Sequence, residues 1–191
     1  DVYRDWVYHW KEPRDVLKKG NPPIHLLNNP EEWLHITDPI QKMVYLDLSS
    51  RLPDSIVSKV DRATMKVSLE ARAPLMDYRV AELSAAIPTN MKIRNGNGKW
   101  LLRRILYKHV PRDLVDRPKK GFKMPISVWL KGPLRDWAES LLDSKKLEQQ
   151  GFFKAEVVNN KWSDFMAGKG SQHYQIWDIL MFQAWLENEK R

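Results

Sequence analysis

The sequence predicts an all-α protein built from many short helices. Apolar residues recur at helical spacing through most of the 191 residues, and proline and glycine divide the chain into short amphipathic segments. No alternating run of apolar and polar residues is long enough to predict a strand. Because 42% of the residues are hydrophobic, the chain has enough apolar material for a core, and wholesale disorder is excluded.

Two regions are expected, residues 1–37 and residues 38–191. The first is broken by prolines and asparagines, yet it is too apolar for a solvated linker, so we expect an irregular, partly helical packing segment. It should cover either the downstream helices or a part of the protein outside this chain. Its large apolar residues are Val2, Trp6, Trp10, Leu26, Leu27 and Trp33. Since the chain starts without Met inside a predicted helix, we interpret it as a fragment of a larger protein.

The second region is expected to be a helical subdomain. Asp38-Pro39 is a strong helix start, because aspartate caps the free N–H groups and proline suits the first helical position. Leu52-Pro53 predicts the end of that helix, and Asp54 and Asp77 predict the N-caps of the next two.

The rest of the subdomain alternates loops and helices. Residues 92–98 contain two glycines and two asparagines and predict a loop with left-handed residues. A basic helix should follow over 99–108, then a short turn of helix from Pro111 and an irregular stretch over 119–125. Further helices are expected near 126–131, 133–143, 154–167 and 173–189.

The basic surplus is concentrated in one part of the chain. The net charge is +8, and residues 91–123 hold eleven Lys and Arg against only Asp113 and Asp116. A concentrated surplus favours one anionic site over general polyanion binding, although a solvated basic face remains the alternative.

Several classes of site and location are not expected. Without cysteine there is no disulfide, thiolate zinc site or cysteine nucleophile. No histidines share the i, i+3 or i, i+4 spacing of a helical metal site, so no metal ligand is predicted. No apolar stretch approaches the ~18–20 residues of a membrane span. We therefore expect a cytoplasmic protein that does not bind a membrane.

Two motifs point to a site. In KVDRATM and SLEARAPLMD, charged residues sit among apolar ones, which predicts buried ion pairs of Arg62 and Arg72 with Asp61, Glu70 or Asp77. In RPKKGF, three cations lie on a short loop bounded by proline and glycine, where they can converge on one anion.

These motifs, with GNGKWLLRRIL between them, resemble the carboxyl-terminal half of the synthetase domain of glutamine-hydrolysing asparagine synthetases. The resemblance implies the helical, carboxyl-terminal part of a PP-loop synthetase domain, without its parallel sheet. It also implies an ATP-dependent ligase of asparagine biosynthesis. Such enzymes activate aspartate as an acyl-adenylate and amidate it with ammonia released from glutamine.

The resemblance also assigns residues. Lys119 matches the lysine of the Arg-Pro-Lys loop, which lies over the nucleotide phosphates and is essential for the synthetase chemistry. Its neighbours Arg117 and Lys120 are expected to contact phosphate or pyrophosphate. Glu70, Arg72 and Asp77 match a Glu-x-Arg-x-Pro-x-x-Asp motif, and we interpret them as residues of the site wall.

Parts of the family pattern do not occur in this sequence. The Ser-Gly-Gly-x-Asp-Ser pyrophosphate loop and the amino-terminal glutaminase cysteine are not found. We therefore expect ATP and Mg²⁺ to be bound mainly outside this chain, and the isolated fragment to be inactive. Its expected partners are the upstream PP-loop half and the glutaminase domain of the same polypeptide, and a homodimer is left open.

Two rival functions are kept. A relative could amidate another carboxylate, such as a sugar acid, because the acid-recognising loops lie largely upstream. A basic helical module that binds nucleic acid, with an affinity that falls steeply with salt, belongs to a different class. It is disfavoured because the basic residues coincide with the family's loop, so no nucleic-acid partner is predicted.

Overall fold

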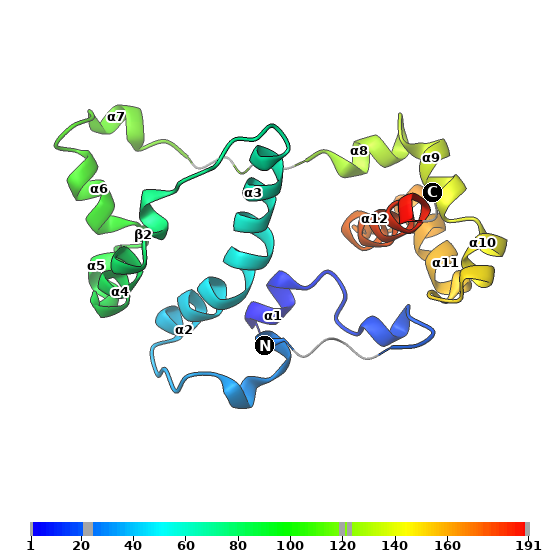
Figure 1. Ribbon diagram of the computed structural model, residues 1–191, viewed down its shortest axis with the longest axis horizontal. Helices are drawn as coiled ribbons and strands as arrows, with labels where there is room; N and C mark the ends of the chain where they lie inside the picture. The colour runs from blue at the N-terminus through cyan, green and yellow to red at the C-terminus, as the bar shows by residue number, and fades with distance from the viewer. Residues whose placement is uncertain (1, 21–24, 119–120, 122–123, 190–191) are drawn as a thin grey trace. The chain divides into compact units, whose positions relative to one another are not determined.

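The computed structural model describes residues 2–20, 25–118, 121 and 124–189, and these residues are mostly helical (Figure 1). In the described part, the only sheet is a two-stranded hairpin. The mostly helical fold expected from the sequence is therefore confirmed. The structure forms two compact units: a terminal unit, residues 1–23 with 121–191, and a central unit, residues 24–120. The expected boundary at residue 37 does not coincide with these units and stays a prediction.

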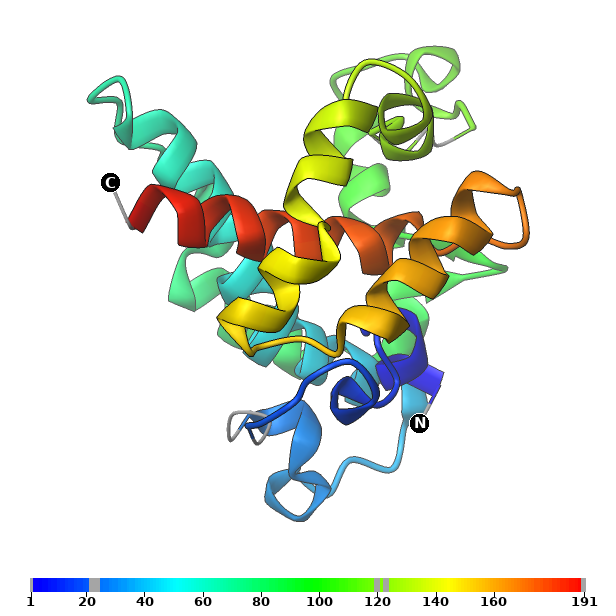
Figure 2. The same cartoon turned by 90° about the vertical axis from the view of Figure 1, so that its right-hand side faces the viewer.

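Helices near both ends of the sequence build the terminal unit. Their bounds are α1 Val2–Val7, η1 Pro13–Asp15, α8 Ile126–Lys131, α9 Arg135–Leu141, α10 Ser144–Gln150, α11 Ala155–Met166 and α12 His173–Glu189. Helix α12 packs against α8, α9 and α11, and Figure 2 shows it running through the middle of this group. The apolar core of the unit includes Leu130, Ala138, Val158, Phe165 and Leu180, each at most 2% exposed.

The early segment joins this core through its backbone. Lys18 N–H donates to Phe152 O at 2.9 Å, and Lys154 N–H donates to Val16 O at 2.8 Å. Val16 is buried in the same cluster as the carboxyl-terminal helices. This part of the first 37 residues therefore packs on downstream helices, which was one of the two expectations.

The central unit is a succession of short elements. Their bounds are η2 Leu26–Asn28, η3 Pro30–Glu32, α2 Pro39–Leu46, η4 Asp47–Val57, α3 Ser58–Met65, η5 Pro74–Met76, α4 Tyr78–Ala86, α5 Thr89–Lys92, β1 Ile93–Arg94, β2 Asn97–Gly98, α6 Trp100–Leu106 and α7 Arg112–Val115. Asp38 caps α2 as expected, because its Oδ1 accepts from Ile40 N–H at 2.8 Å.

The predicted helix end at Leu52-Pro53 is wrong. Helices α2, η4 and α3 follow one another without a break, and η4 is a π-helix with Pro53 inside it. In an α-helix the proline ring clashes with a carbonyl one turn earlier, and the chain around Pro53 is a π-helix instead. Asp54 is consequently not a cap: His25 Nε2 donates to its Oδ2 at 2.9 Å, while His25 Nδ1 accepts from Leu27 N–H.

A hairpin forms where a loop was expected. Strands β1 and β2 are antiparallel, with Ile93 opposite Gly98 and Arg94 opposite Asn97. Asn95 and Gly96 make the turn with φ of 52° and 74°. Left-handed residues at both central positions define the type I′ turn, which suits a two-residue hairpin. The hairpin leads directly into α6.

Candidate functional site

A pocket of about 560 Å³ lies in the central unit beside the hairpin, α6 and α7. Helix α6 supplies one wall because residues 100, 103, 104 and 107 lie at helical spacing on one side of it. The segment that follows α7 supplies the other. The lining residues are Asn97, Trp100, Arg103, Arg104, Tyr107, Arg112, Asp116, Arg117 and Pro118.

The charge of this pocket is strongly positive. Four arginines line it against a single carboxylate, Asp116, which is paired with Arg103 at 2.5 Å. In the described part of the chain, Arg104, Arg112 and Arg117 make no ion pair with a carboxylate. Guanidinium groups hold phosphate and carboxylate oxygens through paired N–H donors. The pocket is therefore suited to an anionic ligand.

Aromatic rings contact two of these cations, Arg104 and Arg112, and also the nearby Arg94. The Arg94 and Arg104 guanidinium groups lie over the Trp100 ring at 5.1 and 6.0 Å from its centroid, and Arg112 lies over Tyr107 at 4.7 Å. Cation–π contacts of this kind leave the N–H donors at the guanidinium edge free to bind. The rings thus orient positive charge without neutralising it.

Arg103 is fixed most tightly. Tyr107, and to a smaller extent Asp116, raise the pKa of Arg103 above its ordinary value, so this guanidinium stays charged. Its Nε is buried and makes no hydrogen bond within the described structure. The Arg103 Nε–H is therefore a buried donor that no described protein group accepts.

Arg117 lines the pocket, and its contact with phosphate stays a prediction. Lys119 and Lys120 lie outside the described residues. The other arginines, Tyr107 and Asp116 were not predicted as site residues. Two signals in the sequence could have found them: the i, i+4 spacing of Arg103 and Tyr107, and the position of Asp116 next to the Arg-Pro-Lys loop.

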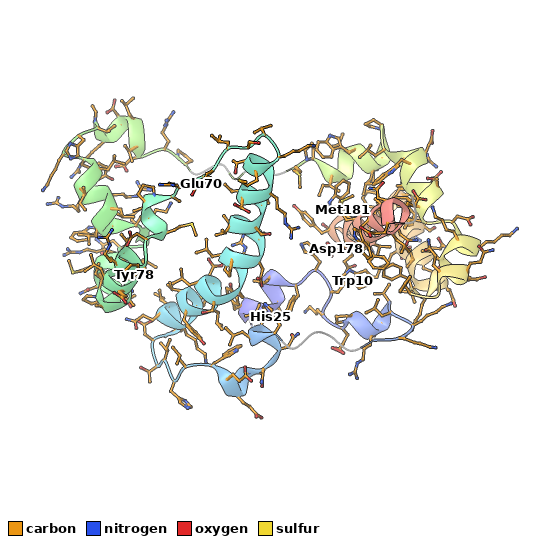
Figure 3. The ribbon with its side chains drawn as sticks, viewed as in Figure 1. Trp10, His25, Glu70, Tyr78, Asp178 and Met181 are labelled. Atoms are coloured by element: carbon orange, nitrogen blue, oxygen red, sulfur yellow. The ribbon has the colours of Figure 1, made fainter. Side chains whose placement is uncertain are left out.

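Glu70 and Arg72 do not line this pocket; Figure 3 labels Glu70. Their ion pair forms, with Arg72 Nη2 donating to Glu70 Oε2 at 3.0 Å, but the side chains are 83% and 67% exposed for Arg72 and Glu70. The prediction that this pair is buried is wrong for this chain. The motif lies in an irregular segment after α3, where neighbouring apolar residues such as Leu69 are themselves 60% exposed.

Asp77 is a helix cap rather than a partner of Arg62 or Arg72. It accepts from Arg79 N–H at 2.9 Å and holds the Arg79 guanidinium with both carboxylate oxygens. The Arg79 guanidinium, followed by its backbone N–H, lowers the pKa of Asp77. The site-wall role of Glu70, Arg72 and Asp77 stays a prediction.

The terminal unit has a smaller, mostly apolar pocket of about 320 Å³, whose lining includes Trp10 and Asp178 (Figure 3). His9 Nδ1 lies 2.9 Å from the Asp178 carboxylate. Burial raises the pKa of Asp178, and the His9 hydrogen bond opposes that rise. Among the described residues that line this pocket, Lys19 and Asp178 are the charged ones, and Asp178 is paired with His9.

Among the residues that the structure describes, no group of three or more His, Asp or Glu side chains could hold a metal ion. Within the same residues, no helix is both long and apolar enough to span a bilayer.

A family model described as asparagine synthase matches residues 1–187. Asparagine synthetase [glutamine-hydrolyzing] 1 of Bacillus subtilis is 32% identical over 97% of this chain and 30% of its own length. A putative glutamine-hydrolysing asparagine synthetase of Mycobacterium tuberculosis is 32% identical over 78% of the chain and 22% of its own length. The Gallus gallus asparagine synthetase is 28% identical over 72% of the chain and 24% of its own length. No solved structure matches. The chain thus spans less than a third of the length of these relatives.

Proposed function

Because this chain belongs to the asparagine synthase family, we propose that it is part of a glutamine-hydrolysing, ATP-dependent amide-forming ligase. In the intact protein, aspartate is activated as an acyl-adenylate with loss of pyrophosphate, and ammonia derived from glutamine then displaces AMP. The basic pocket of the central unit is the observation that supports this proposal most. Arg104, Arg112 and Arg117 line it and make no ion pair with a carboxylate among the described residues, and Arg117 precedes Lys119 by two positions in the sequence.

Lys119 is the residue to which we assign the synthetase chemistry. An ammonium group beside the α-phosphate stabilises the negative charge that develops as the carboxylate attacks and pyrophosphate leaves. Arg117, which lines the pocket, is assigned to the departing pyrophosphate, and Lys120 to a secondary contact. These guanidinium and ammonium groups supply positive charge. They do not replace the successive backbone N–H groups that orient phosphates in a binding loop.

ATP supplies the phosphorus that the carboxylate attacks. The residues present fit its phosphate chain in charge, through Arg104, Arg112 and Arg117. We assign most of the nucleotide and Mg²⁺ contacts to parts of the intact protein outside this chain. The greater length of the relatives supports this division.

The exposed surface of the central unit supports the proposal that this unit contacts a large part of the same polypeptide. Many of its large apolar side chains are exposed, including Val67 at 73%, Leu75 at 66% and Leu83 at 62%. Large exposed apolar side chains in this number are typical of a protein that has an interaction surface. We assign it to contact with the upstream half of the same polypeptide. The cytoplasmic location and assembly as a homodimer stay predictions.

The substitution Lys119→Met in the intact enzyme tests the proposal, because it removes one charge at nearly constant shape. We expect ATP- and aspartate-dependent pyrophosphate release to fall by ~10²-fold or more, the effect of removing one preorganised charge from a transition state. Glutamine hydrolysis should be unchanged, and Lys120→Met should lower pyrophosphate release less.

Lys108→Met is the matched control, since it removes the same charge from the basic stretch at a residue that does not line the pocket. It should keep the parent rate. Normal pyrophosphate release by the Lys119→Met enzyme would refute the assignment of Lys119.

A further inference from the structure

Three side chains tie α6 to the end of α7. Arg103 Nη1 donates to Asp116 Oδ1 at 2.5 Å, and the Tyr107 hydroxyl donates to the same oxygen at 2.6 Å. Tyr107 follows the last residue of α6, and Asp116 follows the last residue of α7. One carboxylate oxygen therefore links the ends of both helices.

The backbone around Asp116 is fixed as well. Asp116 N–H donates to Arg112 O at 2.7 Å, and Arg117 N–H donates to Val115 O at 2.9 Å. The Arg112 guanidinium stacks on Tyr107, the residue that also binds Asp116. The turn that ends α7 is thus held to α6 by two contacts with the same tyrosine.

Asp116 is difficult to explain as a ligand-binding residue. A carboxylate that lines a pocket for an anion repels that anion and lowers its affinity. Its two hydrogen bonds face protein groups, Arg103 and Tyr107. The position of Asp116 is explained if this residue is a structural link that fixes the start of the segment that follows it.

The two residues after Asp116 are themselves conformationally restricted, so a restraint on Asp116 also restrains them. Arg117 and Pro118 alone separate Asp116 from Lys119. Proline fixes its own φ, and the residue before a proline is confined to extended conformations. These two restricted residues make the Arg117-Pro118 segment stiff, so fixing Asp116 also restricts the direction of this segment.

We propose that Asp116, held by Arg103 and Tyr107, is a positioning residue for Lys119 in the synthetase reaction. This inference rests on the function proposed above. Asp116 does not touch the reacting atoms, and it acts by fixing the start of the Arg-Pro-Lys segment. A displacement of about 1 Å in a catalytic group can cost ~10²-fold in rate.

The test uses the intact enzyme and pyrophosphate release from radiolabelled ATP with aspartate under single-turnover conditions, so that slow variants remain measurable. We expect Asp116→Ala to lower the rate ~10–100-fold with glutamine hydrolysis unchanged. Asp113→Ala is the matched control: this aspartate lies on α7, is exposed and does not line the pocket, and it should keep the parent rate.

The Lys119→Met background separates positioning from general structural damage. If Asp116 acts through Lys119, adding Asp116→Ala to Lys119→Met costs nothing further. A loss of the same size in both backgrounds, or an Asp116→Ala rate equal to that of Asp113→Ala, overturns the inference.

Tyr107→Phe covers the case in which Asp116→Ala fails to fold. It removes one of the two hydrogen bonds to Asp116 and should lower the rate ~3–10-fold, within the range of one hydrogen bond, with the same dependence on Lys119. If Lys119→Met itself keeps its rate, the proposed function fails along with this inference. If only Asp116→Ala and Tyr107→Phe keep theirs, this inference alone fails.

Discussion

Asp38 joins two sequence-distant parts of the central unit through one carboxylate. Its Oδ1 accepts from the N–H groups of Ile40 and Gln41, and its Oδ2 accepts from the Thr89 hydroxyl. The Thr89 hydrogen bond is the largest cause that lowers the pKa of Asp38. The group is therefore ionised at neutral pH, and both the cap of α2 and the link to α5 are made there.

The exposed Glu70–Arg72 pair gives a prediction at the residue scale. Arg72→Ala should change the free energy of unfolding of this chain by only ~0–1 kcal/mol, because solvent screens a pair of this exposure. Denaturant melts of the two proteins measure the difference. Glu70→Gln serves as the reciprocal variant and should give a similarly small change. A loss of ~3–5 kcal/mol, as for a broken buried pair, would contradict the exposed geometry.

Residue-level expectations succeeded where the deciding forces are local. The N-caps Asp38 and Asp77 were predicted from the chain, because a cap bonds to residues two or three positions away. The burial of the pair at Glu70 and Arg72 was not, because burial depends on what packs over the pair. The contacts of Asp116 were also not predicted, because both its partners, Arg103 and Tyr107, lie on or directly after a different helix.

At the element scale, Pro53 shows how a strong local signal can be overridden. The sequence predicts that a helix ends there, yet a π-helix carries the chain through to α3. The hairpin at residues 93–98 is the opposite case. Its turn conformations were predicted from asparagine and glycine, whereas strands of only two residues are too short to give an alternating pattern.

The hairpin turn gives a prediction at this scale. Gly96 has a φ of 74°, and Gly98 has no left-handed φ; the position of an added Cβ is open at both. Gly96→Ala should therefore destabilise the central unit by ~1 kcal/mol, the cost of a left-handed conformation in an L-residue. Gly98→Ala is the matched control and should stay within about 0.5 kcal/mol of the parent. Equal unfolding midpoints for both variants would show that the type I′ turn is not retained.

At the scale of the whole molecule, the two units differ in how they bury apolar surface. The terminal unit has a closed cluster of buried residues, from Val16 to Leu180. In the central unit, Leu27 and Leu46 are buried, whereas Leu75 and Leu83 are exposed. This asymmetry supports the proposal that the central unit contacts another part of the intact polypeptide.

The central claim is that this chain contributes Lys119 and a basic pocket to a site whose nucleotide-binding part lies elsewhere in the intact protein. Isothermal titration calorimetry of the 191-residue chain with ATP and Mg²⁺ at physiological salt tests it most directly, with pyrophosphate as the second titrant. We predict a weak, salt-sensitive affinity for pyrophosphate and no tight binding of ATP, because charge without a backbone cradle does not orient the phosphates. A micromolar or tighter dissociation constant for ATP, worth ~8 kcal/mol or more, would contradict the claim and locate the nucleotide site within this chain.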